Sequence, residues 1–349
     1  MRFIGVDLHK TNLVACFLSE DDRTQIETFI LNPQGLARFK RRLRPDDQLV
    51  VEAAANTSYF CRQVKERLAK IVVVDTYRFA VIARSKQKTD KKDAAMLARC
   101  LKLGWLPEVP VPSEQIEQLR HLFQARESLV RMLTQLKNMA PVALVRSGYA
   151  MQRAAFASPG TRGRMAKLEG LSEVDRQIIE MSLRQMSEIE QEISQLEAEI
   201  VERGKGLRGV PRRLPIHGLN LIAAIGLLVE IGNIEPFETS KQLVADAGLA
   251  ASVRQSNQTT RRGKISKQGR KRLRTIGIRA VRTMVNRTKT ALMELYTEKK
   301  REKGAGKAIC ATARKLLVIV FVMLKKELDY GYVEERLYNQ KLRALRACG

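Results

Sequence analysis

The chain has 349 residues, enough for two or three domains, and its hydrophobic fraction of 44% is ordinary for a folded protein. Its 63 Lys and Arg residues outnumber its 37 Asp and Glu residues, so the formal net charge is +26. This excess is far from the near-neutral balance of most enzymes and favours a polyanionic partner, usually nucleic acid. No apolar run approaches the length of a bilayer span, so a membrane partner is disfavoured.

Strand and helix signals alternate over the first hundred residues. Three strands are predicted first, in RFIGVD, NLVACFL and IETFIL. A helix follows in PQGLARFKRRLR, then a strand in QLVVEAA, a helix in SYFCRQVKERLAK and a fully apolar strand in IVVVD. A basic loop leads to the helix DKKDAAMLARCLKLG, which should end near Gly104. This order predicts an α/β domain with a mixed sheet over residues 1–108.

Two long helices are predicted over residues 113–204, after the Pro-rich linker PEVPVPSEQ, with Ser113 as the N-cap of the first. In the second helix, apolar residues follow the 3, 4, 3, 4 spacing of a heptad seam. Glutamates crowd the same segment, and an acidic face repels DNA. We therefore expect an antiparallel helical hairpin or a dimerising coiled coil. The seam consists of Met186, Ile189, Ile193, Leu196 and Ile200.

The remaining sequence predicts a mostly α C-terminal domain over residues 210–300 and a helical tail over residues 301–349. Its first part, RRLPIHGLNLIAAIGLLVEIGNIEPF, predicts two helices around the turn IHGLN. This turn resembles a helix-hairpin-helix, which presents backbone N–H groups to a phosphate. A simple buried helical hairpin is an equally good interpretation. A polar and strongly basic segment then precedes the final helices.

Four carboxylates occupy positions from which they can converge. Asp7 ends the first strand and Glu52 ends a later one, while Asp90 and Asp93 share one face near a helix start. Strand ends and an adjacent helix meet at a sheet edge, and oxygen ligands of this kind suit Mg²⁺ or Mn²⁺. Two such ions about 4 Å apart activate and stabilise oxygens at a phosphodiester. A bound cation would explain why acids lie among lysines in so basic a chain.

Each acid also has a simpler interpretation. Asp90 alone fits a helix N-cap, with Asp93 favourable to the helix dipole in the first turn. Asp7 alone fits a turn at the end of a strand. Asp75, which ends IVVVD, is a rival ligand, although the following TYRFA indicates a turn. The order strand, strand, helix pair favours the metal site over these separate interpretations.

Several segments together resemble one family, the DEDD transposases of bacterial insertion sequences. They are GVDLHKTNLVACF, VVEAAANTSYF, KTDKKDAAMLARCL and GLAASVRQSNQTTRRGKISKQGRKRLR. That family includes the Piv-type DNA invertases and the recombinases guided by a bridge RNA, and the resemblance extends from about residue 1 to 300. It implies a RuvC-like N-terminal domain of the ribonuclease H fold. It also implies four acids that bind Mg²⁺, here Asp7, Glu52, Asp90 and Asp93.

The resemblance further implies a serine nucleophile, which falls on Ser256 in RQSNQ. A serine that attacks a phosphodiester conserves the bond energy as a phosphoserine linkage, but it needs a base or a metal nearby. Family members usually carry glycines directly after the serine, whereas Asn257 and Gln258 follow here. Ser252 is therefore a second candidate, and without the resemblance Ser256 reads as an ordinary polar loop residue.

A basic block runs from Arg261 to Arg287, with eleven Lys and Arg residues and no acid. Such a block favours phosphate contact over a merely solvated face, and its lack of aromatic residues disfavours base stacking as the main mode of binding. The predicted nucleic-acid contacts, including the loop before Asp90, are Lys86, Lys88, Lys91, Lys92, Arg261, Arg262, Lys264, Lys267, Arg270, Lys271 and Arg272.

These features predict a DNA transposase or site-specific recombinase that cuts and rejoins strands at the ends of a mobile element. The resemblance adds a guide RNA that pairs with donor and target DNA, and homodimers that assemble into a tetramer. A Mg²⁺-dependent hydrolytic nuclease of the Holliday-junction-resolvase type is the main alternative. A non-catalytic nucleic-acid scaffold and an ATPase of the actin-like fold are weaker ones.

The expected location is the bacterial cytoplasm, in association with the nucleoid. The start MRFIGVDLHK lacks the layout of a signal peptide. The five cysteines are scattered without a CxxC motif, which fits a reducing compartment and disfavours a zinc site or a disulfide framework.

Overall fold

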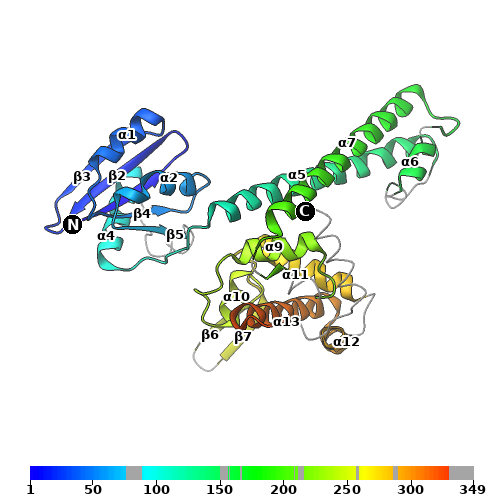
Figure 1. Cartoon of the computed structure of the whole chain (residues 1–349). Helices are drawn as coiled ribbons and strands as arrows, with labels where there is room; N and C mark the ends of the chain where they lie inside the picture. The colour runs from blue at the N-terminus through cyan, green and yellow to red at the C-terminus, as the bar shows by residue number, and fades with distance from the viewer. Residues whose placement is uncertain are drawn as a thin grey trace. The chain divides into compact units, whose positions relative to one another are not determined.

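The structure, a computed structural model, describes residues 1–75, 89–149, 156, 158–165, 167–207, 209–210, 216–256, 259–285 and 290–329. Only the backbone is described for residues 159 and 253–262. The chain forms two compact units, unit 1 (Met1–Ser113) and unit 2 (Glu114–Gly349), shown in Figure 1. The boundary falls within the Pro-rich segment that the sequence indicates as a linker.

Unit 1 is built on a five-stranded sheet with the order β3-β2-β1-β4-β5. β1 pairs antiparallel with β2, and β2 with β3, whereas the β1–β4 and β4–β5 pairs are parallel. The predicted α/β unit with a mixed sheet is therefore confirmed. The strands are β1 (Arg2–Leu8), β2 (Asn12–Ser19), β3 (Thr24–Ile30), β4 (Gln48–Glu52) and β5 (Lys70–Val74).

Helices cover both faces of this sheet. α1 (Pro33–Arg42) and α2 (Thr57–Val64) share a core with Ile4 and Val6, while α4 (Asp90–Leu103) shares the opposite core with Phe3 and Val50. Side chains alternate between the faces of a strand. Asp7 is four residues after Phe3 and Glu52 is two residues after Val50, so both acids belong to the face that α4 covers.

Gly5 allows α4 to lie directly on β1. A Cβ atom at this position would be 2.0 Å from the Ala94 carbonyl oxygen and 2.5 Å from the Ala98 nitrogen. α4 buries Leu97 and Leu101 against the sheet. It ends at Gly104, whose φ of 67° is left-handed, as the sequence predicts. This close approach brings the first turn of α4 beside the end of β1.

Unit 2 begins with α5 (Glu114–Arg146) and α7 (Glu173–Gly204), which lie side by side, with α6 (Pro159–Met165) near their far end (Figure 1). Of the predicted seam, Met186 and Ile200 are fully buried. The two helices form a hairpin within the chain, while a coiled coil between copies remains a prediction.

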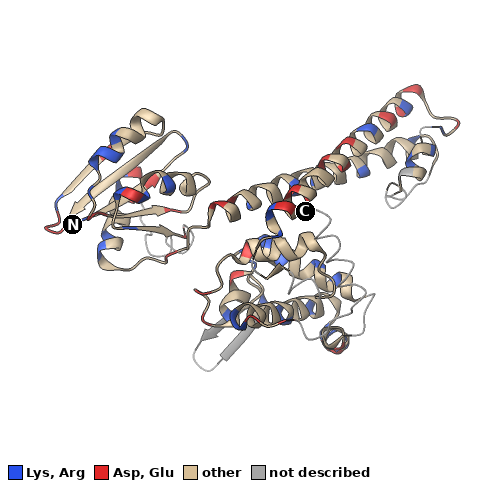
Figure 2. Cartoon of the chain, viewed as in Figure 1, with Lys and Arg blue, Asp and Glu red and all other residues tan. Residues whose placement is uncertain are grey.

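Acidic residues recur along α7 (Figure 2), and some of them are neutralised within the hairpin. Glu190 accepts from Lys137 of α5 and from Arg162 of α6, and Glu197 accepts from Arg126 of α5. The Arg162 hydrogen bond holds the pKa of the Glu190 carboxyl below its ordinary value. Glu190 and Glu197 are thus compensated by cations of α5 and α6 and connect α7 to them.

The rest of unit 2 is mostly helical, as predicted, and shares one hydrophobic core that includes Leu227, Leu243, Leu273 and Leu316. α13 packs in this core with α10 and α11, although the sequence predicts a separate tail from residue 301. The elements are α9 (Leu221–Ile231), α10 (Ser240–Asp246), β6 (Ala251–Ser256), β7 (Thr259–Ile265), α11 (Lys271–Met284), α12 (Ala291–Lys303) and α13 (Ala305–Lys326).

The described cysteines and helices bear on two predictions made from composition, those on disulfides and on membrane spans. Cys16, Cys61, Cys100 and Cys310 are free thiols, and burial raises the pKa of Cys61 to about 11, so this thiol is protonated at neutral pH. Cys348 lies outside the described residues. Among the helices of the described part, none is long and apolar enough to cross a membrane.

Candidate functional site

Three side chains meet at the C-terminal end of β1. His9 Nε2 lies 3.3 Å from Asp7 Oδ2 and 3.2 Å from Asp90 Oδ2. One ligand atom from each residue lies within 4.8 Å of the other two. The His9 Nε2 atom is buried and makes no hydrogen bond within the described residues. Two carboxylates and an imidazole in this arrangement form a donor set that suits Mn²⁺ and can hold Mg²⁺.

The local backbone explains why His9 and Asp90 reach Asp7. After β1 ends, the His9 N–H donates to the Asn12 carbonyl (2.9 Å), and the His9 carbonyl accepts from Asn56 Nδ2 (2.8 Å). Across from them, Thr89 is the N-cap of α4, and its side chain accepts from the Lys92 N–H. The interpretation of Asp90 as the helix N-cap is therefore wrong, and its carboxylate is left to face the end of β1.

The Asp7 carboxyl carries an electrostatic penalty in this position. Burial raises its pKa above the ordinary value of 3.8, the charges of Asp90 and Asp93 raise it further, and His9 lowers it. Two nearby carboxylates disfavour each other's ionised forms, and a bound cation would remove that repulsion. This environment is typical of a site that needs a positive ion to be complete.

Of the predicted acids, Asp7 and Asp90 belong to this tight group, whereas Glu52 and Asp93 lie outside it. Glu52 is half-buried at the end of β4, where the pairing of Val6 with Val51 makes it a neighbour of Asp7 in the sheet. Asp93 is half-buried in the first turn of α4. Neither belongs to the 4.8 Å cluster of described residues. The tight group is therefore Asp7, Asp90 and His9.

The rival ligand Asp75 lies outside this group, whereas His9 belongs to it without having been predicted. Asp75 directly follows β5, where its N–H donates to the Pro107 carbonyl, and it is absent from the described cluster. His9 was not among the predicted ligands, because His9, His121 and His217 are too far apart in the sequence to predict a ligand cluster. A usable signal exists, however: in GVDLHK the imidazole comes two residues after the acid that ends a strand.

Ser256 is the last residue of β6 and pairs with Thr259, the first residue of β7. The predicted serine loop is thus the tip of a β-hairpin, while Asn257 and Gln258 lie outside the described residues. The alternative serine, Ser252, is engaged nearer the base. Its hydroxyl donates to the Lys264 carbonyl (3.2 Å), and a Cβ atom at Gly263 would be 2.3 Å from its Oγ.

The predicted phosphate-binding cations differ in whether they are exposed or are paired with acids of the chain. Lys264, Lys267 and Lys271 are exposed, and no ion pair is formed by them within the described residues. Lys91 and Lys92 are exposed on the first turn of α4. Arg261 and Arg262 lie on β7, opposite Arg254 and Val253 of β6. Lys86 and Lys88 lie outside the described residues.

Arg270 and Arg272 instead have partners inside the chain. Arg270 Nε is 2.9 Å from an Asp246 carboxylate oxygen. Arg272 donates to Glu127 and to Glu230, both at 2.7 Å. These half-buried pairs connect α11 to α5, α9 and α10, and breaking one would leave a charge without its counterion. Their contact with nucleic acid remains a prediction, and their contribution to unit 2 is structural.

Comparison with known families finds matches in both units. A model of the DEDD transposases of the IS110 group, described as a transposase, matches residues 4–147. A second model, described as the transposase IS116/IS110/IS902 family, matches residues 214–297. The first match contains Asp7, Glu52, Asp90 and Asp93, and the second contains Ser256.

Individual relatives carry similar descriptions. A putative transposase of Sinorhizobium fredii is 32% identical over 192 residues, which is 54% of this chain and 46% of that protein. A probable family 20 transposase of Pseudomonas aeruginosa is 25% identical over 84% of this chain and 88% of its own. The transposase for insertion sequence element IS1111A of Coxiella burnetii is 24% identical over 70% of this chain and 68% of that protein. The alignment thus spans less than half of the first relative and most of the other two.

Proposed function

Because the chain belongs to the IS110 family of DEDD transposases, we propose that it cuts and rejoins DNA strands at the ends of an insertion sequence. The observation that carries this proposal is the meeting of Asp7, His9 and Asp90 at the end of β1 in a chain with a net charge of +26. An acidic centre in so basic a protein fits a cation that acts on a polyanion.

We assign unit 1 to the RuvC-like form of the ribonuclease H fold. The sheet order β3-β2-β1-β4-β5, with three antiparallel strands followed by parallel ones, supports this assignment. The position of acids at the ends of β1 and β4, on the face covered by α4, supports it as well.

The same residues fit a divalent metal, Mg²⁺ or Mn²⁺. Asp7 and Asp90 would hold it with His9, and Glu52 beside Asp7 in the sheet and Asp93 in the first turn of α4 are candidates to complete the ligand set. A bound cation would supply Lewis-acid stabilisation of phosphodiester oxygens. The raised pKa of Asp7 means that this carboxylate is protonated at a higher pH than an ordinary aspartate, and a bound cation would favour its ionised form.

In the proposed strand transfer, the Ser256 Oγ attacks a DNA phosphorus atom while the bond from phosphorus to the leaving sugar oxygen breaks. The serine proton passes to a base, and the leaving oxygen takes up a proton to become a free hydroxyl end. The phosphoserine ester conserves the bond energy, so a free hydroxyl end can reverse the step and rejoin the strand. The place of Ser256 at a hairpin tip, and the engagement of the Ser252 hydroxyl, favour Ser256 as nucleophile.

DNA contact in this proposal falls to the exposed lysines Lys264, Lys267 and Lys271, with Arg261 and Arg262 on the same hairpin. The family resemblance adds a guide RNA that pairs with donor and target DNA, and homodimers that join into a tetramer. The α5–α7 hairpin is a candidate for the contact between copies. The site of action would be the nucleoid in the bacterial cytoplasm.

Hydrolysis by water is the second candidate function. Asp7, His9 and Asp90 all lie within unit 1, so this group of ligands would not need a residue of unit 2 to bind a cation. A junction-resolving nuclease would use the same acids and leave cut strands that are never rejoined.

A plasmid recombination assay tests the proposal. The donor plasmid carries the DNA that flanks this gene, and the product is a rejoined junction detected by sequencing. Wild-type protein should yield junctions, whereas Asp7→Ala, Asp90→Ala and Ser256→Ala should lower their yield by at least about 10³-fold, as for loss of catalytic groups. Cut ends without junctions would support the nuclease, and undiminished junctions in all three variants would exclude both enzymes.

A further inference from the structure

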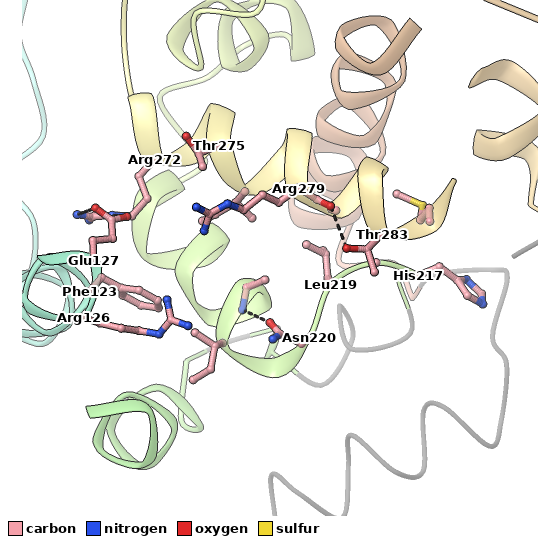
Figure 3. A pocket seen from close by; sticks show the side chains of 16 residues that line it. Phe123, Arg126, Glu127, His217, Leu219, Asn220, Arg272, Thr275, Arg279 and Thr283 are labelled. Atoms are coloured by element: carbon pink, nitrogen blue, oxygen red, sulfur yellow. Dashed lines mark hydrogen bonds and ion pairs between the residues drawn. The ribbon is translucent and has the colours of Figure 1, made fainter. Parts of the chain in front are cut away.

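Unit 2 contains a cavity of about 460 Å³ between α5, α9 and α11, and no residue of the β6–β7 hairpin lines it. Figure 3 shows its lining, with Arg126 and Phe123 from α5, Arg279 and Thr283 from α11, and Asn220 at the start of α9. The volume is within the range of small-molecule sites and is sufficient for one nucleotide unit. None of the residues proposed above for the metal or for strand transfer lines it.

One part of the cavity is apolar. Phe123, Ile222 and Ile276 line it, and Phe123 is almost fully buried. A Cβ atom at Gly226 of α9 would be 3.1 Å from the Phe123 ring, so the glycine lets α9 hold this ring in place. Such a surface favours a flat, weakly polar group such as a nucleobase over a sugar or an ion.

The charged lining leaves one cation available. Arg126 is bound to Glu197, and Arg272 is bound to Glu127 and Glu230. Arg279 is exposed and forms no ion pair with the described residues. One free guanidinium matches the single negative charge of a phosphodiester. It would not balance the several charges of a nucleoside triphosphate.

The turn Ile216–Asn220 closes one end of the cavity and requires a glycine. Gly218 has a φ of +76°, and a Cβ atom there would be 2.2 Å from the Ala280 carbonyl oxygen of α11. Asn220 caps α9 by accepting from the Ala223 N–H (2.8 Å). The motif that resembles a helix-hairpin-helix is thereby pressed against α11 at the cavity.

We propose that this cavity binds one unpaired nucleotide of a nucleic acid, with its base on the apolar part and its phosphate on Arg279. This inference rests on the proposed function, because the ligand is part of the DNA or RNA that a transposase handles. It goes beyond that function by giving the chain a site for a nucleotide displaced from a duplex, separate from the metal centre.

Fluorescence anisotropy with four labelled probes tests the proposal on the full chain. The probes are a DNA duplex, the same duplex with one unpaired nucleotide, and the two RNA counterparts. Wild-type protein should bind the bulged form of at least one nucleic acid about fivefold or more tightly than its perfect duplex, in keeping with the value of one base contact. The DNA and RNA pairs show which of the two supplies the nucleotide.

Two variants and one control make the test specific. Arg279→Gln removes the free cation, and Thr283→Phe fills the cavity from its exposed rim, so each should abolish the preference for the bulge. Arg282→Gln, an exposed arginine of α11 outside the cavity, should weaken all probes alike and keep the preference.

The proposal would be overturned if wild-type protein showed no preference for the bulged probes, or if that preference survived in both cavity variants. In either case, binding of the duplex probes would still support a DNA-binding protein. Failure of wild type to bind any probe would count against both the cavity and the proposed function.

Discussion

Asp7 is the residue on which the metal-site geometry depends. It lies at the end of β1 on the face covered by α4, with Asp90 and His9 close by. A group with a raised pKa stabilises the fold most at low pH, and that contribution is lost as pH rises through its folded pKa. At neutral pH the ionised Asp7 therefore destabilises metal-free protein.

Asp7→Asn should accordingly raise the melting temperature of the metal-free protein at pH 7 by a few degrees, on the order expected for a modest stabilisation. The measurement is thermal unfolding in EDTA. The difference between variant and wild type should shrink as pH falls toward 3.8, the ordinary pKa of the group. With Mn²⁺ added, only wild type should gain stability. A variant that is less stable at pH 7 would contradict this account.

His9 should belong to the metal centre, since its Nε2 lies between the two carboxylates. His9→Gln is expected to weaken Mn²⁺ binding roughly tenfold, the lower end of the loss when a residue that supports a metal is removed. Pulsed electron paramagnetic resonance of bound Mn²⁺ should show a ¹⁴N coupling in wild type and none in the variant. His121→Gln, on the exposed surface of α5, is the control. An unchanged coupling in His9→Gln would exclude the imidazole as a ligand.

At the scale of elements, the packing of α4 on β1 positions the site. Sequence alone predicts both elements, because β1 is apolar with an acid at its end and α4 places Ala94, Leu97 and Leu101 on one face. The register of contact between them could not be predicted. It depends on Gly5, whose missing side chain lets the helix backbone touch the strand.

Gly5→Ala should therefore separate α4 from β1. Overpacking of this kind typically costs about 1–3 kcal/mol, and Mn²⁺ affinity should fall as Asp90 moves from Asp7. Chemical denaturation and calorimetric titration measure the two effects. Gly163→Ala, at a helical glycine with open space around it, should change neither. If Gly5→Ala keeps the stability and the metal affinity of the wild-type protein, the close approach of α4 to β1 is unimportant.

The serine hairpin is the element that sequence reasoning did not find. Residues 251–265 are rich in Arg, Thr, Ser and Gln and lack the apolar alternation that predicts a half-buried strand. The strands pair through their backbones, so the pairing leaves little trace in the side-chain pattern. His9 was missed for a related reason: a spacing rule for histidine clusters does not detect one imidazole that joins two acids from distant segments.

For the molecule as a whole, the candidate chemistry is divided between two units. The carboxylates and His9 lie in unit 1, while Ser256 and most of the predicted phosphate contacts lie in unit 2. Composition predicts the polyanionic partner from the charge of +26, and strand-end positions predict the metal ligands. The ion pairs of Arg270 and Arg272 could not be predicted, because Asp246, Glu127 and Glu230 come from separate helices.

The salt dependence of DNA binding should distinguish free cations from paired ones. Replacing Lys264, Lys267 and Lys271 together by Gln should reduce the slope of log K against log salt by about 3, one for each phosphate contact. The control replaces Lys102, Lys299 and Lys325, each of which is bound to a carboxylate. Equal losses of slope in both triple variants would show that only total charge matters.

The most direct test of the central claim is to trap the covalent intermediate. The DNA that flanks the gene is prepared with a nick beside the expected cleavage point, incubated with protein and Mn²⁺, denatured and digested for mass spectrometry. The account predicts a metal-dependent protein–DNA adduct on Ser256 that is absent in Ser256→Ala and in Asp7→Ala. Strand cleavage without any adduct, undiminished in Ser256→Ala, would contradict it.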